Sequence, residues 1–229
     1  MILAHPDDPE FFCGGTIAKW VSEGHQVSYC LLTKGEKGIN ENFNPDDVNL
    51  IKEIRFLEQK KAGAVLGVRK IRYLDNPDGY LVPSLTIRRQ IVREIRISKP
   101  DIVVSCDPTN YFLRDTYINH PDHRAAGQIV VDSVFPAVQS QAFFPELMVM
   151  EKLYPHIVKE VWFSLASKPN VSINVTKYWN KKIEALYEHH SQIGDKKEFD
   201  KRMLSRRSEG SSIKKPKFEE LFHRIILQR

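Results

Sequence analysis

Two short segments of the chain combine histidine and aspartate at close spacing. They read His5-Pro6-Asp7-Asp8 and His120-Pro121-Asp122-His123. In the first, His5 and Asp8 are three residues apart across a turn that proline stiffens, so they can aim an imidazole and a carboxylate at one point. Imidazole and carboxylate are two of the ligand types that zinc takes in proteins.

The chemistry that such residues support is metal-dependent hydrolysis. A catalytic zinc ion takes three protein ligands and keeps one position for water. A histidine of the second segment would complete a site with His5 and Asp8. Asp7 would then stand as a carboxylate beside the bound water, whose pKa the metal lowers to about 7. The remaining histidine would steady an oxyanion or protonate a leaving amine.

Each segment also has a plain structural interpretation. His-Pro-Asp sequences are common in loops, and an aspartate beside a proline often caps a helix. Both segments, however, follow expected strands and should reach the edge of a parallel sheet where ligands bind. A cluster of ionisable groups is costly there without a purpose, so the two segments together favour catalysis.

The elements that must position these residues follow an alternating pattern. The expected strands are Ile2–Ala4, Val27–Thr33, Ile71–Leu74, Asp101–Cys106, Glu160–Leu165 and Val171–Val175. The expected helices are Gly15–Glu23, Asp46–Leu66, Ser84–Ser98, Asp122–Val134, Tyr178–His190, Lys196–Arg206 and Lys217–Ile226. This alternation indicates βαβ units. The predicted fold class is therefore α/β, with a Rossmann-like, mainly parallel sheet flanked by helices.

Length and composition are those of an ordinary globular chain. Its 229 residues are 41% hydrophobic and 28% charged, which favours a single domain over residues 1–229. No run approaches the roughly 18 apolar residues of a membrane span, and no secretory signal is visible. The three cysteines, Cys13, Cys30 and Cys106, are widely spaced and odd in number. They argue against a disulfide framework and favour a reducing, cytoplasmic location.

The net charge of +5 is concentrated near the C-terminus. Residues 1–176 carry 20 Lys and Arg against 21 Asp and Glu, and residues 177–229 carry 14 against 8, so the balances are −1 and +6. We expect residues 177–229 to form a basic helical part of the domain. Its charges fit a polyanion-binding patch or solvated helix faces, and the interleaved acidic residues favour the second. No nucleic-acid partner is therefore expected.

Further segments match one known family. Besides the two motifs, they are Gly14-Gly15-Thr16-Ile17-Ala18, Thr33-Lys34-Gly35-Glu36, Arg55 with Glu58, Leu66-Gly67-Val68, Asn76-Pro77-Asp78-Gly79 and His190-Ser191-Gln192. With them the chain resembles the LmbE-like, or PIG-L, family of zinc-dependent N-deacetylases. Its members act on N-acetylglucosaminyl-phosphatidylinositol, on mycothiol and bacillithiol precursors and on some antibiotics. The resemblance implies a hydrolase that removes the N-acetyl group from an N-acetylglucosamine-type conjugate.

The resemblance also implies roles for individual residues. His5, Asp8 and His123 would be the zinc ligands, although other divalent ions can substitute. Asp7 would be the general base, and His120 the polar or acidic partner of the tetrahedral intermediate.

Arg55, Asn76 and Asp78 are implied to touch sugar hydroxyls or to anchor the wall around them. For Arg55 the alternative is an ion pair with Glu58, three residues on. Many members of the family have an acidic residue directly after the two aspartates. Here Pro9 follows the aspartates and the acidic residue, Glu10, comes one position later.

Two other functions compete with the deacetylase. A phosphoesterase with two metal ions about 3.5–4 Å apart needs more ligands than one His-Asp-His set. A nucleotide-binding or nucleic-acid-binding module is disfavoured, because Cys13-Gly14-Gly15-Thr16 is not a G-x-G-x-x-G fingerprint and the chain has no P-loop. The expected partner is a small N-acetylated sugar conjugate. The sequence identifies neither the aglycone nor the oligomeric state. The segment Pro136–Tyr154 fits a lid, a subunit contact or core packing.

Overall fold

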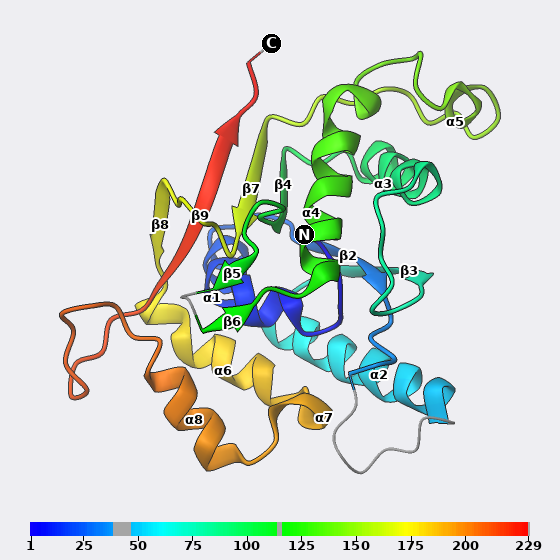
Figure 1. The fold of residues 1–229 in the computed structure, drawn as a ribbon. Helices are drawn as coiled ribbons and strands as arrows, with labels where there is room; N and C mark the ends of the chain where they lie inside the picture. The colour runs from blue at the N-terminus through cyan, green and yellow to red at the C-terminus, as the bar shows by residue number, and fades with distance from the viewer. Residues whose placement is uncertain (39–46, 114–115, 229) are drawn as a thin grey trace. The chain divides into compact units, whose positions relative to one another are not determined.

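The computed structural model describes residues 1–38, 47–113 and 116–228 (Figure 1). The chain divides into two compact units. Unit 1 comprises Met1–Ala4, Gly79–Val171 and Phe222–Arg229, and unit 2 comprises His5–Asp78 and Ser172–Leu221. Each unit is thus assembled from segments far apart in the sequence. The single domain expected over residues 1–229 stays a prediction.

Unit 2 is built on a parallel strand pair with a helical crossover. β2 (Ser28–Thr33) pairs with β3 (Lys70–Asn76), and α2 (Val48–Leu66) connects them. Parallel neighbours need such a crossover, because a tight hairpin reverses the chain. The other elements are α1 (Asp8–Ser22), the 3-10 turn η3 (Thr176–Tyr178), α6 (Trp179–Tyr187), α7 (His190–Ile193) and α8 (Lys196–Leu204).

Helices α1, α2 and α6 pack against one another in unit 2 (Figure 1). Close approach of α1 to α6 is possible because α1 carries a glycine at position 14, where a Cβ would lie 2.9 Å from Cγ of Lys182 on α6. Beside it, the rings of Trp179 and Phe218 stack with centroids 3.8 Å apart. This apolar packing anchors α1, the helix that begins in the first motif.

Unit 1 holds a second set of strands. β4 (Ile102–Cys106) pairs parallel with β7 (Glu160–Ser164), and β9 (Glu219–Ile226) pairs antiparallel with β7. α4 (Pro121–Asp132) packs on β1 (Ile2–Leu3) and β4. The other elements are α3 (Leu85–Ser98), the hairpin strands β5 (Phe112–Leu113) and β6 (Tyr117–Ile118), the π-helical turn η2 (Ser133–Val138) and α5 (Pro145–Val149). The strand β8 (Val171–Asn174) begins at the last residue of this segment of unit 1 and continues in unit 2.

The predicted α/β fold class is confirmed. Both parallel pairs, β2 with β3 and β4 with β7, lie where the sequence predicts strands, and helices flank them. The expected start of α3 is also confirmed, because the Ser84 hydroxyl accepts a hydrogen bond from the Ile87 backbone N–H at 3.3 Å.

The expected helix Lys217–Ile226 is wrong, because this segment forms β9. Glu220 and Phe222 are buried, whereas Glu219 and Leu221 are exposed. A period of two residues is that of a strand, and the pairing of residues 223–226 with β7 outweighs the local helix preference of the segment. The basic C-terminal part is therefore helical only in its first half.

Other helix boundaries also shift. The helix expected at Gly15–Glu23 begins at Asp8, because Pro9 lies in its first turn, where a proline loses no hydrogen bond. The helix expected at Asp122–Val134 gives way to the π-helical turn at Ser133, and Tyr178–His190 is divided between η3, α6 and α7. Asp46, the expected start of α2, lies outside the described residues.

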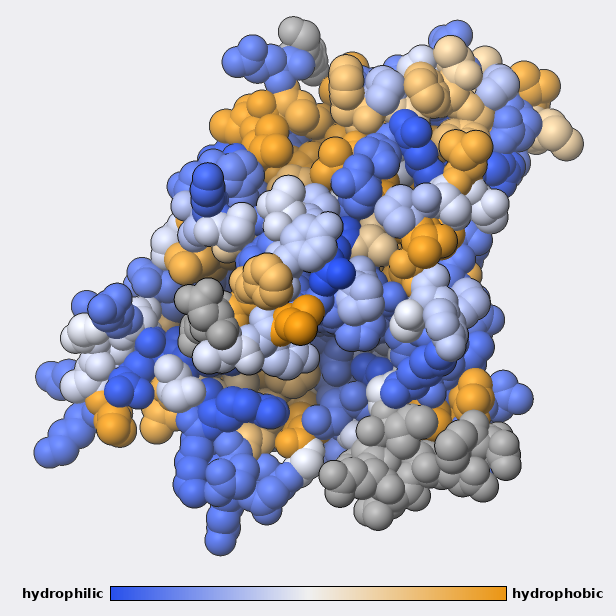
Figure 2. Space-filling model, in the orientation of Figure 1, coloured by the Kyte–Doolittle hydropathy of each residue, from blue (hydrophilic) through white to orange (hydrophobic). Residues whose placement is uncertain are grey.

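Surface features bear on the remaining expectations. In the segment Pro136–Tyr154, Leu147 is buried and Met150 is 79% exposed, so part of it is core packing, and the lid and the subunit contact stay predictions. Hydrophilic side chains cover α8 on the face drawn in Figure 2. Among the described residues, none of the helices is both long and apolar enough to cross a membrane.

Candidate active site

The first motif forms the turn that opens α1. Asp7 is the N-cap residue, and its φ of 85° lies in the left-handed region that few residues except glycine adopt. Asp8 and Glu10 lie in the first turn, where the positive end of the helix dipole stabilises carboxylates. Backbone strain of this kind is concentrated at functional sites.

His5 lies between two carboxylates of unit 2. Its Nε2 is 3.0 Å from Oδ1 of Asp78, and its Nδ1 is 3.4 Å from Oδ2 of Asp8. The backbone N–H of His5 also donates to Asp8 at 2.9 Å. Burial acts to raise the pKa of Asp78, but the hydrogen bond and charge of His5 outweigh it and hold that pKa at about 2. Two carboxylates therefore fix the orientation of the His5 ring.

Arg55 of α2 is buried and reaches the first motif. Its Nη1 donates to the carbonyl oxygen of Gly35 at 2.7 Å, and its Nη2 donates to that of Pro6 at 2.7 Å. The same Nη2 lies 3.2 Å from Oδ2 of Asp7. Burial raises the pKa of Asp7, and Arg55 opposes that shift. A Cβ on Gly35, whose φ is 69°, would lie 2.4 Å from Arg55, so this approach needs glycine.

The alternative partner expected for Arg55 has contacts elsewhere. Glu58 accepts hydrogen bonds from the backbone N–H of Ser191 at 2.8 Å and from its hydroxyl at 2.7 Å. The neighbouring Gln192 donates to the carbonyl oxygen of Gly38 at 3.0 Å. The His190-Ser191-Gln192 segment thus joins α7 to α2 and to the loop after β2.

Asn76 and Asp78 are held by the loop that follows β2. The Asn76 side chain donates to the carbonyl oxygen of Leu32 at 3.0 Å. Asp78 accepts from the backbone N–H of Lys37 at 2.8 Å, and its own N–H donates to Glu36 at 3.0 Å. These contacts fix the end of β3 beside His5. Contact of Arg55, Asn76 or Asp78 with a substrate stays a prediction.

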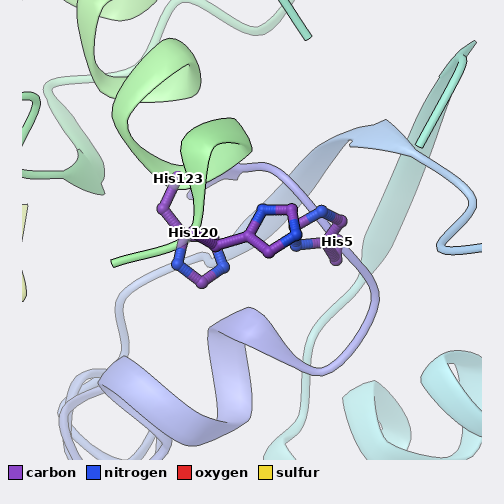
Figure 3. Close-up of side chains that lie close together, drawn as sticks. All are labelled: His5, His120 and His123. Carbon is purple, nitrogen blue, oxygen red and sulfur yellow. The ribbon is translucent and has the colours of Figure 1, made fainter. Parts of the chain in front are cut away.

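The second motif opens α4 in unit 1. His120 is the N-cap residue, and its Nδ1 accepts a hydrogen bond from the backbone N–H of Asp122 at 3.2 Å. An acceptor Nδ1 assigns the proton of a neutral ring to Nε2. His123, one turn later, has its Nδ1 3.1 Å from Oδ1 of Asn119. The two rings lie with centroids 5.3 Å apart, and Figure 3 draws both with His5.

Asp122 has a structural role within this motif. Its fully buried carboxylate accepts hydrogen bonds from the backbone N–H groups of Gly79 at 2.8 Å and Leu81 at 3.1 Å. The segment after β3 is thereby joined to the start of α4.

A family model described as "PIG-L: GlcNAc-PI de-N-acetylase" matches residues 1–134. This span is more than half of the chain, and it includes both motifs and the arginine that contacts the first. The chain belongs to the PIG-L family. The resemblance seen in the sequence is thereby confirmed.

Its relatives in the family are deacetylases of amino-sugar conjugates. The diacetylchitobiose deacetylase of Thermococcus kodakarensis is 33% identical over 84% of this chain and 68% of its own length. A probable N-acetyl-α-D-glucosaminyl L-malate deacetylase of Bacillus anthracis is 28% identical over 86% of this chain and 81% of its own. The structure of N,N'-diacetylchitobiose deacetylase from Pyrococcus horikoshii superposes with a TM-score of 0.85 at 27% identity, covering 98% of this chain and 82% of that one.

The donor types of this family member suit a metal ion. Unit 2 supplies His5 and Asp78, and unit 1 supplies His120, Asp122 and His123, as residues of the types that could hold an ion. Figure 3 draws the three histidines. Imidazole nitrogen and carboxylate oxygen are both zinc ligands. The identity of the ion and its ligands are matters of proposal.

The sequence interpretation assigned no role in the site to several buried polar residues around the motifs, although it named Glu10. Asn119 contacts His123, and Gln59 accepts from the Asp7 N–H at 2.8 Å. Glu10 and His189 are fully buried, and Nε2 of His189 lies 3.2 Å from Oε2 of Glu10. Burial acts to lower the pKa of His189, but Glu10 outweighs it and raises that pKa. In the sequence, these residues could have been found from Gln59, a polar residue among the apolar positions of the helix that also carries Arg55.

Proposed function

We propose that this PIG-L member is a zinc-dependent hydrolase that removes the N-acetyl group from an N-acetylglucosamine-type conjugate. The observation that supports this function most directly is the His5–Asp8 pair at the start of α1, with Asp7 beside it, in a chain of this family. The names of the relatives support the amide hydrolysis and the amino-sugar substrate. The substrate is a small molecule, and N,N'-diacetylchitobiose is the first compound to test.

In the proposed site, His5, Asp8 and His123 bind the zinc ion. Asp78 contacts Nε2 of His5 and Asn119 contacts Nδ1 of His123, so we assign Nδ1 of His5 and Nε2 of His123 to the metal. A hydrogen bond to one ring nitrogen in this way is typical of histidines that bind metals. Zinc would supply Lewis acidity, which lowers the pKa of water and polarises the acetyl carbonyl.

Asp7 is the proposed general base. It is the carboxylate of the first motif that this assignment leaves off the metal, and it takes the proton of the attacking water. Its position is supported on two sides, because Arg55 contacts its carboxylate and Gln59 accepts from its backbone N–H.

His120 is the proposed hydrogen-bond donor and acid. The tetrahedral intermediate carries a negative oxygen, and the amine must leave with a proton. In the neutral ring, the Nδ1 of His120 accepts the capping bond from Asp122, and its Nε2–H donates a hydrogen bond to the negative oxygen. Protonation of the amine requires the charged ring, whose Nδ1 carries a proton and gives up the capping bond. The capping bond also holds the ring at the start of α4.

Arg55, Asn76 and Asp78 are proposed to anchor the wall that the sugar meets. Their hydrogen bonds to the backbone of Pro6, Gly35, Leu32 and Lys37 support the role of anchoring the wall, rather than direct contact with sugar hydroxyls. The wall would then determine which sugar hydroxyls fit beside the N-acetyl group, while the aglycone extends away from it.

The test is acetate release from a panel of N-acetyl sugars by protein stripped of metal and reloaded with zinc. We expect release from N,N'-diacetylchitobiose or an N-acetylglucosamine conjugate, loss of activity on chelation, recovery with zinc, and close to one zinc per chain. Two metal ions per chain with phosphoester hydrolysis, or no acetate from any member of the panel, would contradict the proposal.

Two substitutions separate the roles of base and acid. Asp7→Asn should keep the zinc content and lower kcat about 10²–10⁴-fold, because the proton acceptor is lost. His120→Ala should also keep zinc and lower kcat more than it raises KM, since its interaction forms mainly in the transition state. Loss of zinc in either variant would show that the residue is a ligand instead.

A reducing, cytoplasmic compartment is also proposed. Cys13, Cys30 and Cys106 are all free and buried, which supports a location where thiols stay reduced. Cell fractionation with an antibody to the chain tests this, and recovery outside the cytoplasm would contradict it. Sedimentation analysis measures whether the chain forms a homo-oligomer in solution.

A further inference from the structure

A buried polar cluster lies behind the first motif in unit 2. It consists of Glu10 in the first turn of α1, Tyr29 on β2, Gln59 on α2 and His189 before α7, and each is at most 2% exposed. Of these residues, only Gln59 appears in the mechanism above, as the acceptor of the Asp7 N–H. Burying so many polar groups is costly unless each is hydrogen-bonded, so their contacts indicate what the cluster does.

One peptide unit of the motif is held at both of its polar ends by α2. The carbonyl oxygen of Pro6 accepts from Nη2 of Arg55 at 2.7 Å, and the N–H of Asp7 in the same peptide donates to Oε1 of Gln59 at 2.8 Å. Arg55 and Gln59 are four residues apart, so they lie on one face of the helix. This peptide leads into Asp7, whose left-handed backbone conformation needs such external support.

Glu10 sets the orientation of the Gln59 amide. The Nε2 of Gln59 donates to both oxygens of Glu10, each at 3.0 Å. Glu10 also accepts from the hydroxyl of Tyr29 at 3.0 Å, and His189 lies 3.2 Å away. A carboxylate that only accepts excludes the flipped amide, in which the carbonyl of Gln59 would face Glu10 and its NH₂ would face the N–H of Asp7.

We propose that Gln59 is a positioning residue for Asp7, and that the buried Glu10–His189 pair acts on Asp7 through it. The inference rests on the proposed function, in which Asp7 is the base. Gln59 touches neither substrate nor metal in this scheme. It holds the Pro6–Asp7 peptide so that the carboxylate of Asp7 stays at the angle that proton transfer needs.

The first test compares Gln59→Met with Gln59→Glu. Methionine matches the size of glutamine but accepts no hydrogen bond from Asp7, so kcat should fall on the order of 10–100-fold. KM and zinc affinity should change by less than about threefold, because ligands and substrate contacts remain. Glutamate, with a proton on the oxygen that faces Glu10, donates to Glu10 and keeps its other oxygen for the Asp7 N–H, so it should retain more kcat than methionine. If Gln59 served only packing, the order would be reversed, because methionine suits an apolar site better.

The second test is a double-mutant cycle with Glu10→Gln. A glutamine at position 10 no longer imposes one orientation on the amide of Gln59, so kcat should fall with KM retained. In the Gln59→Met background the same change should alter kcat by less than about twofold, because Glu10 acts through Gln59. Full, independent effects of the two substitutions would overturn the proposed route. If Gln59→Met does not fold, Glu10→Gln and Gln59→Glu decide the matter by the same split between kcat and KM.

The matched control is Gln128→Met, the same change at an exposed glutamine of α4 that donates to Asp132. It should leave kcat, KM and zinc affinity as in the wild type. Failure of the wild type to release acetate in the presence of zinc would contradict the proposed function. An active wild type with Gln59→Met at full kcat would overturn only the positioning role.

Discussion

At the scale of single residues, both motifs are held in place by neighbouring side chains that take no part in the proposed reaction. Asn119 is the clearest case in unit 1. Its amide NH₂ donates to the carbonyl oxygen of Asn110 at 2.8 Å, which directs its Oδ1 to Nδ1 of His123. Its backbone N–H donates to Tyr111 at 2.9 Å, so the whole residue is fixed. His123 is thereby held in one ring orientation before any metal binds.

Asn119→Ala should therefore weaken zinc binding about 10–100-fold, the usual cost of losing such a partner. Competition with a chromophoric chelator measures the affinity directly, without an activity assay. Asn110→Ala is the control, because its side chain bonds to Leu165 at 2.6 Å and keeps the backbone carbonyl that holds Asn119. Equal zinc affinity in folded Asn119→Ala and wild type would rule out this role.

At the scale of elements, a buried ion pair joins three segments of unit 2. Lys182 of α6 donates to Glu220 at 2.6 Å and to the carbonyl oxygen of Phe11 at 2.9 Å. Glu220 also accepts from the backbone N–H groups of Gly15 and Thr16 in α1. The charges are paired and hydrogen-bonded on both sides, so the pair ties the start of β9 to the helix of the first motif.

Lys182→Met should lower the free energy of unfolding by about 3–5 kcal/mol, because it leaves Glu220 buried without its cation. Urea unfolding monitored by tryptophan fluorescence provides the measurement. Lys181→Met is the neighbouring control, since Lys181 pairs with Glu184 at an exposed site and should cost at most about 1 kcal/mol. Similar losses in the two variants would contradict a special role for the buried pair.

The β7–β9 pair carries a pH-dependent contact in unit 1. Arg224 makes two hydrogen bonds to Glu160, at 2.8 and 2.6 Å, and these lower the pKa of Glu160 against a smaller opposing effect of burial. A lowered folded-state pKa means that the stabilisation is present above the unfolded pKa of about 4.3 and is lost as the pH falls through the folded value.

Glu160→Gln should thus cost about 0.5–1 kcal/mol at pH 7, and the difference from wild type should shrink steadily below about pH 4. Urea unfolding of both proteins at pH 7, 5, 4 and 3 follows the trend. Glu209→Gln, at an exposed site, should show no such trend. A constant difference across this range would mean that the charge of Glu160 is not what stabilises the strands.

At the scale of the whole molecule, the excess positive charge of residues 177–229 is broken up by acidic partners. Lys181, Lys196 and Lys201 each lie within 3.6 Å of a carboxylate on the same helix. Lys182 and Arg224 pair with Glu220 and Glu160. These five cations of the described part of the segment thus have acidic partners, which is typical of solvated helix faces rather than of a stripe that follows a phosphate backbone.

We accordingly expect no saturable binding of duplex or single-stranded DNA at micromolar protein. Fluorescence anisotropy with labelled oligonucleotides at 50 and 200 mM salt tests this. A protein that uses several phosphate contacts would lose affinity steeply between the two salt concentrations. Such a steep loss from a measurable affinity would restore the polyanion interpretation.

The sequence by itself determined the parts of this protein that depend on residue type and short spacing. His5, Asp7, Asp8, His120 and His123 could be named because histidine and aspartate at these spacings are chemically distinctive. The parallel strands β2, β3, β4 and β7 and the start of α3 at Ser84 could be placed because hydrophobic pattern and helix-start signals are local properties. The family match over residues 1–134 confirms the family that these motifs indicate, and the roles of their residues stay predictions.

Only the tertiary structure decided which distant residues support the motifs. Gln59 and Arg55 meet the Pro6–Asp7 peptide across about fifty residues of chain, and His189 meets Glu10 across 179. Likewise, Glu219–Ile226 becomes a strand because β7 pairs with residues 223–226 and β8 is its other neighbour in the sheet. Local spacing cannot encode such contacts, because a buried donor and acceptor pair wherever the fold brings them together, whatever their separation in the sequence.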